Sequence, residues 1–367
     1  MPISAVDAIP LAFQHTRQQL FQPFRFWQWT KIAVVGLLAG ELGSGGGFHG
    51  SGFNFPHQAG ASRHLTGPSW AGIDPALLAV LVAVLVIAGL VFGIILMYIS
   101  SVMRFVLFDS VLVKECHIRQ GWSRRQGPGW RYFLWKLAYL LVTLAILVVL
   151  VGIPLAFAFA AGWLKEPKEH VLPLVLGGIV LFLVLLILFV ALAVIFVLTK
   201  DFVVPQMALE EIGVIEGWRR LWPMIKAEQG GFAGYIGMKI VMAIGAGIVV
   251  GIATLILGLF IAIPTVGLSI LAILTGKSAG LTWNAYTITL AVVVGIILLA
   301  VFLYMIALIS VPIIVFFPAY SIYFFAARYP ALSGALYPAP APAVELMASP
   351  SAPEQPPPLP PAPEPAG

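Results

Sequence analysis

Charged residues are scarce in this chain, and cysteine is nearly absent. Only 10% of the 367 residues are charged, whereas 60% are hydrophobic. A soluble domain carries about 25% charged and about 45–50% apolar residues, so this composition excludes a fold in water. The single cysteine, Cys116, excludes an intrachain disulfide, and its basic surroundings predict a reduced thiol. The sequence therefore predicts an all-α, polytopic integral membrane protein.

Long stretches without charge locate the membrane spans. A helix needs about 20 apolar residues to cross about 30 Å of hydrocarbon. The first span is the weakest because it contains Lys31, which can snorkel to the interface, and Glu41 at its far end. The fifth is expected to end before Pro264, and Pro312 and Pro318 are expected to bend or interrupt the sixth. The six predicted transmembrane helices cover residues 24–42, 75–108, 132–161, 171–199, 231–262 and 283–327.

The distribution of basic residues predicts the orientation. Most of the 20 Lys and Arg residues fall on the side that carries both termini, which places both termini in the cytoplasm. We therefore attribute the net charge of +5 to cytoplasmic Lys and Arg residues that set the membrane orientation, and we expect no nucleic-acid partner. The span interiors hold almost no ionisable residue, which argues against an ion-coupled transporter.

An internal repeat divides the predicted membrane domain, residues 1–335, into three tandem two-helix units. The segments 105–112 and 202–209 are each followed by a Gly-Trp pair, Gly121-Trp122 and Gly217-Trp218, and then by a new span. The two signals recur in phase at about 97 residues, which is typical of repeated structural units. The N-terminus supplies a fainter third copy.

The cytoplasmic segments between spans combine basic and aromatic residues. In residues 207–228, apolar residues recur at three- and four-residue intervals opposite charged ones, which predicts an amphipathic helix in the headgroup plane. A plain connector whose basic residues only set topology is an equal alternative. The candidates for contact with anionic lipid are Trp122, Arg124, Arg125, Trp218, Arg219, Arg220 and Trp222.

Two further groups of residues carry weaker signals. Arg104 and Asp109, at the end of the second span, are candidates for a functional polar pair, although two interfacial anchors are the simpler interpretation. Ala243, Gly247 and Gly251 are spaced by four and predict close packing of a neighbouring helix.

No motif predicts a cofactor, a metal or a nucleotide. Gly276-Lys277-Ser278 lacks the glycine five positions earlier that a phosphate-binding loop requires. His49, His57 and His64 share one predicted outer loop without a clustered carboxylate, so no metal site is expected there. Residues 336–367 are rich in proline and alanine and predict a disordered cytoplasmic tail, which is a spacer or a ligand for a protein partner.

The six spans and the run from Asp201 to Met207, followed by Gly217-Trp218-Arg219-Arg220, resemble bacterial membrane proteins related to the glycerophosphoryl diester phosphodiesterase membrane domain. The resemblance covers roughly residues 5–335. It implies a similar membrane layout and a location in the bacterial cytoplasmic (inner) membrane. Catalysis in that family belongs to a separate soluble domain, and a proline-rich tail stands here instead, so no catalytic residue is carried over.

These observations favour a non-enzymatic membrane-organising or accessory protein that contacts anionic lipid or a partner through its cytoplasmic basic-aromatic segments. The first alternative is a permease for a lipid-like or hydrophobic solute, with a cavity between repeats. The second is a membrane-embedded enzyme, which requires five cytoplasmic side chains to converge. These are Asp109, Glu115, His117, Glu210 and Glu211.

Overall fold

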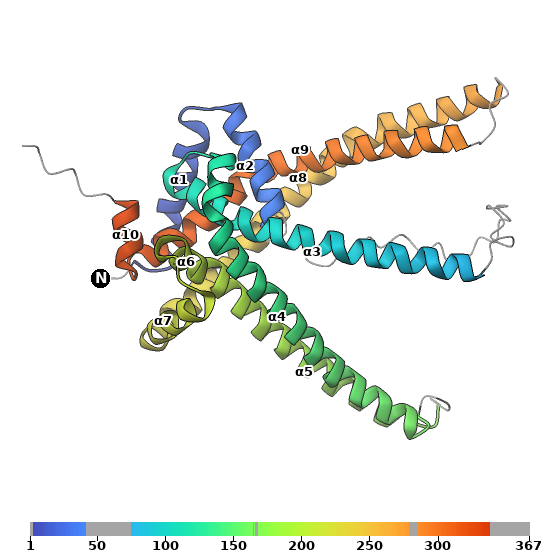
Figure 1. Ribbon diagram of the computed structural model, residues 1–367, viewed down its shortest axis with the longest axis horizontal. Coiled ribbons are helices and arrows are strands. Elements are labelled where there is room, and N and C mark those ends of the chain that lie inside the picture. The colour runs from blue at the N-terminus through green and yellow to red at the C-terminus, as the bar shows by residue number, and fades with distance from the viewer. Residues whose placement is uncertain (1–2, 42–74, 164, 166–167, 279–284, 338–367) are drawn as a thin grey trace, which may run out of the picture.

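The computed structural model describes residues 3–41, 75–163, 165, 168–278 and 285–337. Regular structure in these ranges is entirely helical, without a strand. Long arms diverge from a common base, at which the N-terminal helix α1 and the C-terminal helix α10 both lie (Figure 1). The prediction of an all-α membrane protein is confirmed at this level.

Five helices in the described residues are long and apolar enough to cross a membrane. They form three arms, which are α3 alone, α4 beside α5, and α8 beside α9 (Figure 1). Helix α5 does not end where its predicted span ends. It continues through a π-helical turn, η3 (Thr199–Val203), into α6 (Val204–Glu210). The long helices are α3 (Pro75–Val113), α4 (Ile118–Ala160), α5 (Val171–Leu198), α8 (Gln229–Ser278) and α9 (Ala285–Ala326).

The remaining helices belong to the base. They are α1 (Ala8–Phe21), α2 (Phe26–Ala39), α7 (Val214–Ala227) and α10 (Pro330–Leu336). Helix α2 corresponds to the first predicted span, but its 14 residues rise only about 21 Å, which is short of the about 30 Å of hydrocarbon. Residues 42–74, which include the three histidines of the predicted outer loop, and the tail from residue 338 lie outside the described residues. Six spans therefore stay a prediction.

The prolines do not end the helices in which they lie. Helix α8 runs without interruption through Pro264 to Ser278, so the predicted end near residue 262 is wrong. Helix α9 likewise contains both Pro312 and Pro318 and continues to Ala326. Hydrophobic surroundings favour continued helix, because an unwound segment would expose several unpaired backbone groups, whereas a proline leaves only one or two.

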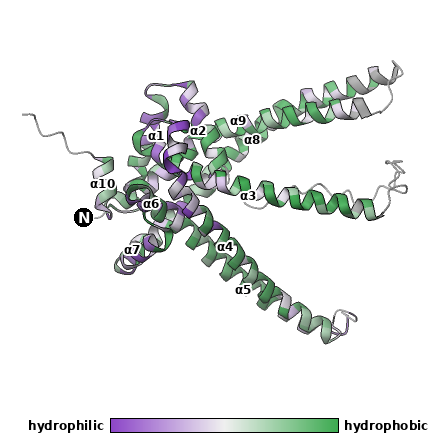
Figure 2. Cartoon of the chain, in the orientation of Figure 1, coloured by the Kyte–Doolittle hydropathy of each residue, from purple (hydrophilic) through white to green (hydrophobic). Residues whose placement is uncertain are grey.

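The buried core lies in the base and the arms are apolar on their surfaces. Aromatic side chains from three elements, Phe202, Tyr235 and Phe324 among them, pack with ring centroids 4.6–5.9 Å apart. The arms carry exposed Leu, Ile, Val and Phe along their length. Figure 2 shows this division, with hydrophobic arms and hydrophilic residues gathered at the base. An exposed apolar surface of this extent fits a hydrocarbon environment.

Candidate functional site

Ionisable side chains from all three arms meet where the arms join the base. Glu41 follows α2, Arg104 lies on α3, Lys136 on α4 and Lys239 on α8, while η3 contributes two consecutive residues. All are buried except Lys136, which is half-buried. We call this set the ionic hub. Its members are Glu41, Arg104, Lys136, Lys200, Asp201 and Lys239.

Two carboxylates connect the arms within the ionic hub. Glu41 forms ion pairs with Arg104 and with Lys200, whose Nζ lies 2.6 Å from the carboxylate Oε2. Asp201 pairs with Lys239 and accepts a hydrogen bond from the Tyr235 hydroxyl at 2.9 Å. Glu41 therefore joins α2 to α3 and η3, and Asp201 joins η3 to α8.

Neighbouring residues of the π-helical turn serve different partners. All five residues of η3 are buried, which an amphipathic α-helix at a surface would not allow. Lys200 pairs with Glu41, and Asp201 pairs with Lys239. Such single π-turns are frequent at functional sites in other proteins.

Positive charge exceeds negative charge in the ionic hub. Four cations face two carboxylates among the described residues. Lys136 is the hub cation that pairs with no carboxylate in the described part of the chain. Its Nζ donates to Ser100 Oγ at 3.3 Å and lies 5.5 Å from the Tyr132 ring centroid. The cavity bounded by Glu41, Arg104 and Lys200 measures about 20 Å³, which is room for about one water molecule.

The ionic hub lies near one headgroup layer of a membrane crossed by the arms. Arg104 is 29 residues from the far end of α3 and Lys136 is 24 residues from the far end of α4, which correspond to about 44 Å and about 36 Å. A bilayer is about 30 Å thick in its hydrocarbon core and about 40–45 Å with its headgroups. The charged side chains thus lie at the edge of the hydrocarbon.

The ionic hub was not predicted, although one signal for it is present in the sequence. An aromatic residue precedes a lysine by four positions at the start of each unit, in Trp27/Lys31, Tyr132/Lys136 and Tyr235/Lys239. In the last two, the lysine Nζ lies over the ring at 5.5 and 5.8 Å from its centroid. The span interiors hold almost no ionisable residue, but the span ends carry cations, of which Arg104 and Lys239 are paired with carboxylates of other elements.

The predicted polar pair does not form. Arg104 pairs with Glu41, and Asp109 is held by Arg125, whose Nε and Nη2 donate to the two carboxylate oxygens at 2.6 and 2.7 Å. Arg125 Nη1 also donates to the Ala208 carbonyl oxygen at 2.5 Å. Residues 104 and 109 are five positions apart and so do not share one helix face, whereas Arg125 is on the adjacent α4. Arg125 is consequently a buried link and not a lipid contact.

The amphipathic helix predicted over residues 207–228 is divided in two, because α6 ends at Glu210, Glu211 has a left-handed backbone, and α7 begins at Val214. Helix α7 packs much of its apolar face on the protein. Trp218 donates from its indole nitrogen to Thr199 Oγ1 at 2.9 Å instead of facing lipid. Arg220 is bound by Glu210 and Glu216. Arg219 keeps 81% of its side-chain surface exposed. Trp222 is 52% exposed, with Lys226 Nζ 5.4 Å from its ring centroid.

The first basic-aromatic segment divides in the same way. Trp122 packs at the edge of Tyr98 with centroids 6.2 Å apart, whereas Arg124 is exposed. Gly121 approaches Val106 and Gly217 approaches Val203, so the Gly-Trp positions of the two units make equivalent contacts. An added Cβ would lie 3.2 Å from Val106 at Gly121, which is tight, and 2.6 Å from Val203 at Gly217, where the neighbour would have to shift.

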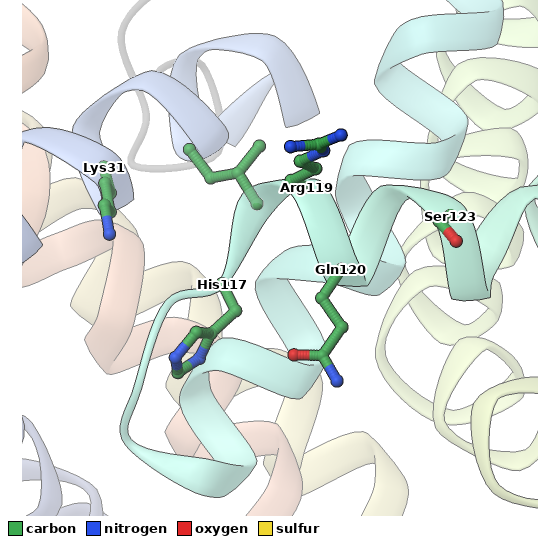
Figure 3. A pocket seen from close by; sticks show the side chains of 6 residues that line it. Lys31, His117, Arg119, Gln120 and Ser123 are labelled. Carbon is green, nitrogen blue, oxygen red and sulfur yellow. The ribbon is translucent and has the colours of Figure 1, made fainter.

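An open groove in the base lies between α2 and the start of α4. It measures about 640 Å³ and is lined by Lys31, His117, Ile118, Arg119, Gln120 and Ser123. Figure 3 shows Lys31 on α2 and the other labelled side chains at the first turns of α4. No carboxylate lines this groove. We call it the basic groove.

Of the predicted helix-packing positions in α8, Gly251 has no close neighbour in the described chain, whereas close packing at Ala243 and Gly247 stays a prediction. Ala243 and Gly247 are half-buried, and Gly251 has open space where a side chain would begin. Close approach occurs elsewhere, at Gly36 of α2, where an added Cβ would lie 2.5 Å from Ile314 of α9. A small residue therefore permits close packing of α2 on α9 in the base.

Three of the five side chains of the enzyme hypothesis have separate partners. Asp109 is bound by Arg125 and Glu210 by Arg220, while Glu115 makes only an exposed contact of 4.0 Å with Arg25. Burial raises the pKa of the Cys116 thiol, which keeps it protonated and poorly nucleophilic. Over the described ranges, no three His, Cys, Asp or Glu residues are placed to hold a metal ion.

One comparison with known proteins found a match. A family model covers residues 3–334, and its description is a family of unknown function, DUF7544. The comparisons with curated proteins and with solved structures found no match. The match spans the arms and the base together, so both parts belong to what the family model describes.

Proposed function

The chain belongs to the DUF7544 family, and we propose that it is a non-enzymatic membrane protein that holds anionic phospholipid headgroups at its base. The basic groove is the observation that carries this proposal. Its volume, about 640 Å³, is large enough for a headgroup, and its lining contains two cations, a histidine and no carboxylate. An anion bound there meets attraction without opposing charge from the lining.

Two features of the surroundings support a lipid phosphate in the basic groove. Trp29 of α2 donates to the Leu308 carbonyl oxygen at 2.9 Å, and Leu308 lies 23 residues from the far end of α9, or about 35 Å. The groove is thus level with the headgroups. In addition, α4 begins beside it after His117 without a side-chain cap, so its first backbone N–H groups and helix dipole favour an anion.

The exposed part of α7 forms a second surface of the base with similar chemistry. Ile215 is 84% exposed and Trp222 52% exposed, beside the cations Arg219 and Lys226. An apolar and a basic side chain together suit the boundary between acyl chains and anionic headgroups. We place this surface in the cytoplasmic leaflet, in agreement with the distribution of Lys and Arg.

The test compares lipid retention by two charge-matched variants. The purified full chain is incubated with mixed phosphatidylglycerol and phosphatidylcholine, and retained lipids are counted by native mass spectrometry. Lys31→Gln with Arg119→Gln should weaken phosphatidylglycerol retention by about 2 kcal/mol, at about 1 kcal/mol for each basic residue near an anionic surface. The control, Lys165→Gln with Lys168→Gln, removes the same charge at the far end of the α4/α5 arm. Equal retention by the two variants would refute the proposal.

The alternatives lack a supporting observation in the described residues. A permease needs a wet cavity at mid-membrane, but the groove there, about 440 Å³ between α4 and α5, has a wholly apolar lining that includes Leu150, Pro154 and Leu181. The resemblance to the glycerophosphoryl diester phosphodiesterase membrane domain, the bacterial inner-membrane location and a partner for the proline-rich tail stay predictions.

A further inference from the structure

We infer that Lys136, where α4 leaves α3, binds the phosphate of one individual phospholipid, with the acyl chains running along the two arms. This inference extends the proposed lipid function to a second and more enclosed site. It depends on a different residue, on a different helix face, from the basic groove. The two proposals can therefore fail separately.

The charge balance of the ionic hub is the first reason. Removing charges from water costs several kcal/mol for each ion unless a partner compensates. Glu41 compensates Arg104 and Lys200, and Asp201 compensates Lys239. Lys200 is also within electrostatic range of Arg104, Lys136 and Lys239. The ionic hub thus favours an additional anion.

The position of Lys136 is the second reason. The interior of the ionic hub has room for about one water molecule, so a phosphate does not fit between the paired charges. Arg104, Lys200 and Lys239 are each exposed by less than a tenth of their surface. Lys136 is half-buried and is therefore the hub cation that a ligand reaches. Ser100 Oγ accepts from its Nζ at 3.3 Å and donates to the Ala39 carbonyl oxygen at 3.3 Å, which positions the ammonium group at the junction of α3 and α4.

Aromatic side chains at the same junction indicate the level of the membrane interface. Tyr98 of α3 contacts Trp122, Trp130 and Phe133 of α4, with centroids 5.7–6.2 Å apart. Trp and Tyr concentrate at the boundary between headgroups and hydrocarbon. Beyond this level α3 and α4 diverge into separate arms (Figure 1) and expose leucine, valine and isoleucine. A phosphate at Lys136 would thus place acyl chains against apolar helix surfaces.

The ligand is a lipid phosphate and not free phosphate, because the diverging arms offer surface for acyl chains. Three variants test this in the purified full chain. Lys136→Gln removes the cation, Lys136→Arg keeps it, and Lys165→Gln removes one positive charge at the far end of the same arm. Phosphatidylglycerol binding is measured by native mass spectrometry, with and without excess inorganic phosphate, and far-ultraviolet circular dichroism verifies that each variant is folded.

Lys136→Gln should weaken phosphatidylglycerol binding about fivefold or more, the scale of one basic residue at an anionic headgroup. Lys136→Arg and Lys165→Gln should bind as the parent does, and inorganic phosphate should not displace the lipid. Parental binding by Lys136→Gln would overturn the inference, as would displacement by inorganic phosphate. A loss confined to the Lys31 and Arg119 variant would also overturn it while leaving the basic groove proposal intact.

Discussion

Replacing Glu41 by glutamine tests whether the ionic hub holds the arms together. Glu41 is 2% exposed and is paired with both Arg104 and Lys200. Glutamine keeps the size of the side chain and one acceptor oxygen but removes the charge. The variant therefore leaves two buried cations without their shared carboxylate. We expect a large loss of stability with little change in packing volume.

The magnitude follows from the burial of the pair. Removing one partner of a buried ion pair costs about 3–5 kcal/mol, because the remaining charge is left uncompensated. The retained amide oxygen still accepts a hydrogen bond, so we expect a value near the lower limit, about 3 kcal/mol. The matched control is Glu115→Gln. Glu115 and Arg25 are 4.0 Å apart with side chains 55% and 61% exposed, and such pairs contribute about 0–1 kcal/mol.

The assay is denaturant unfolding of the detergent-solubilised full chain, followed by tryptophan fluorescence. Adding Lys200→Met to Glu41→Gln removes one of the two unpaired cations, so the double variant should recover part of the lost free energy of unfolding. Two results would refute the reasoning. One is a Glu41→Gln cost no larger than that of Glu115→Gln, and the other is strict additivity of the costs at Glu41 and Lys200.

Two further predictions concern the base. Burial and nearby Lys114 lower the pKa of His15 from 6.5 to about 4, so its stabilising contribution is complete above pH 6.5 and is lost as the pH falls toward 4. The unfolding free energy should drop by about 2 kcal/mol between pH 7.5 and pH 5, and His15→Gln should remove this part of the slope. Gly217→Ala should cost about 1–3 kcal/mol in thermal or denaturant unfolding, because the new Cβ would lie 2.6 Å from Val203. Gly237→Ala, in open space, should be neutral, and equal effects at the two glycines would contradict the packing argument.

The arms were predictable from the sequence because hydrophobic length is a local property. Three long uncharged stretches became α3, α5 and α9 with similar boundaries, whereas α4 begins at Ile118 and not at residue 132. The periodicity of residues 207–228 predicted α7 but not the break before it. The predicted helix end was wrong where the hydrocarbon environment outweighs the local preference of proline. Pro264 reads as a helix end by local chemistry, yet α8 continues beyond it because hydrocarbon favours internally bonded backbone.

The pairing of charges was not predictable, since partners lie far apart in sequence. Arg104 and Asp109 seemed a pair because they are neighbours, but their partners are Glu41 and Arg125. Likewise Trp218 and Arg220 have lipid-binding chemistry, yet Thr199, Glu210 and Glu216 bind them in the base. Residue type indicates what a side chain can bind, and tertiary contacts decide which partner it has.

The scarcity of charge by itself indicated a membrane protein, because the free energy of transferring apolar helices from water to hydrocarbon depends on composition and length. Only the tertiary structure decided where the few charges gather. It brings Glu41, Arg104, Lys136, the η3 pair and Lys239 together from helices up to about 200 residues apart in the sequence. The physical reason is that removing a charge from water is costly unless a counter-charge compensates it, and Glu41 and Asp201 supply that compensation to cations of other elements.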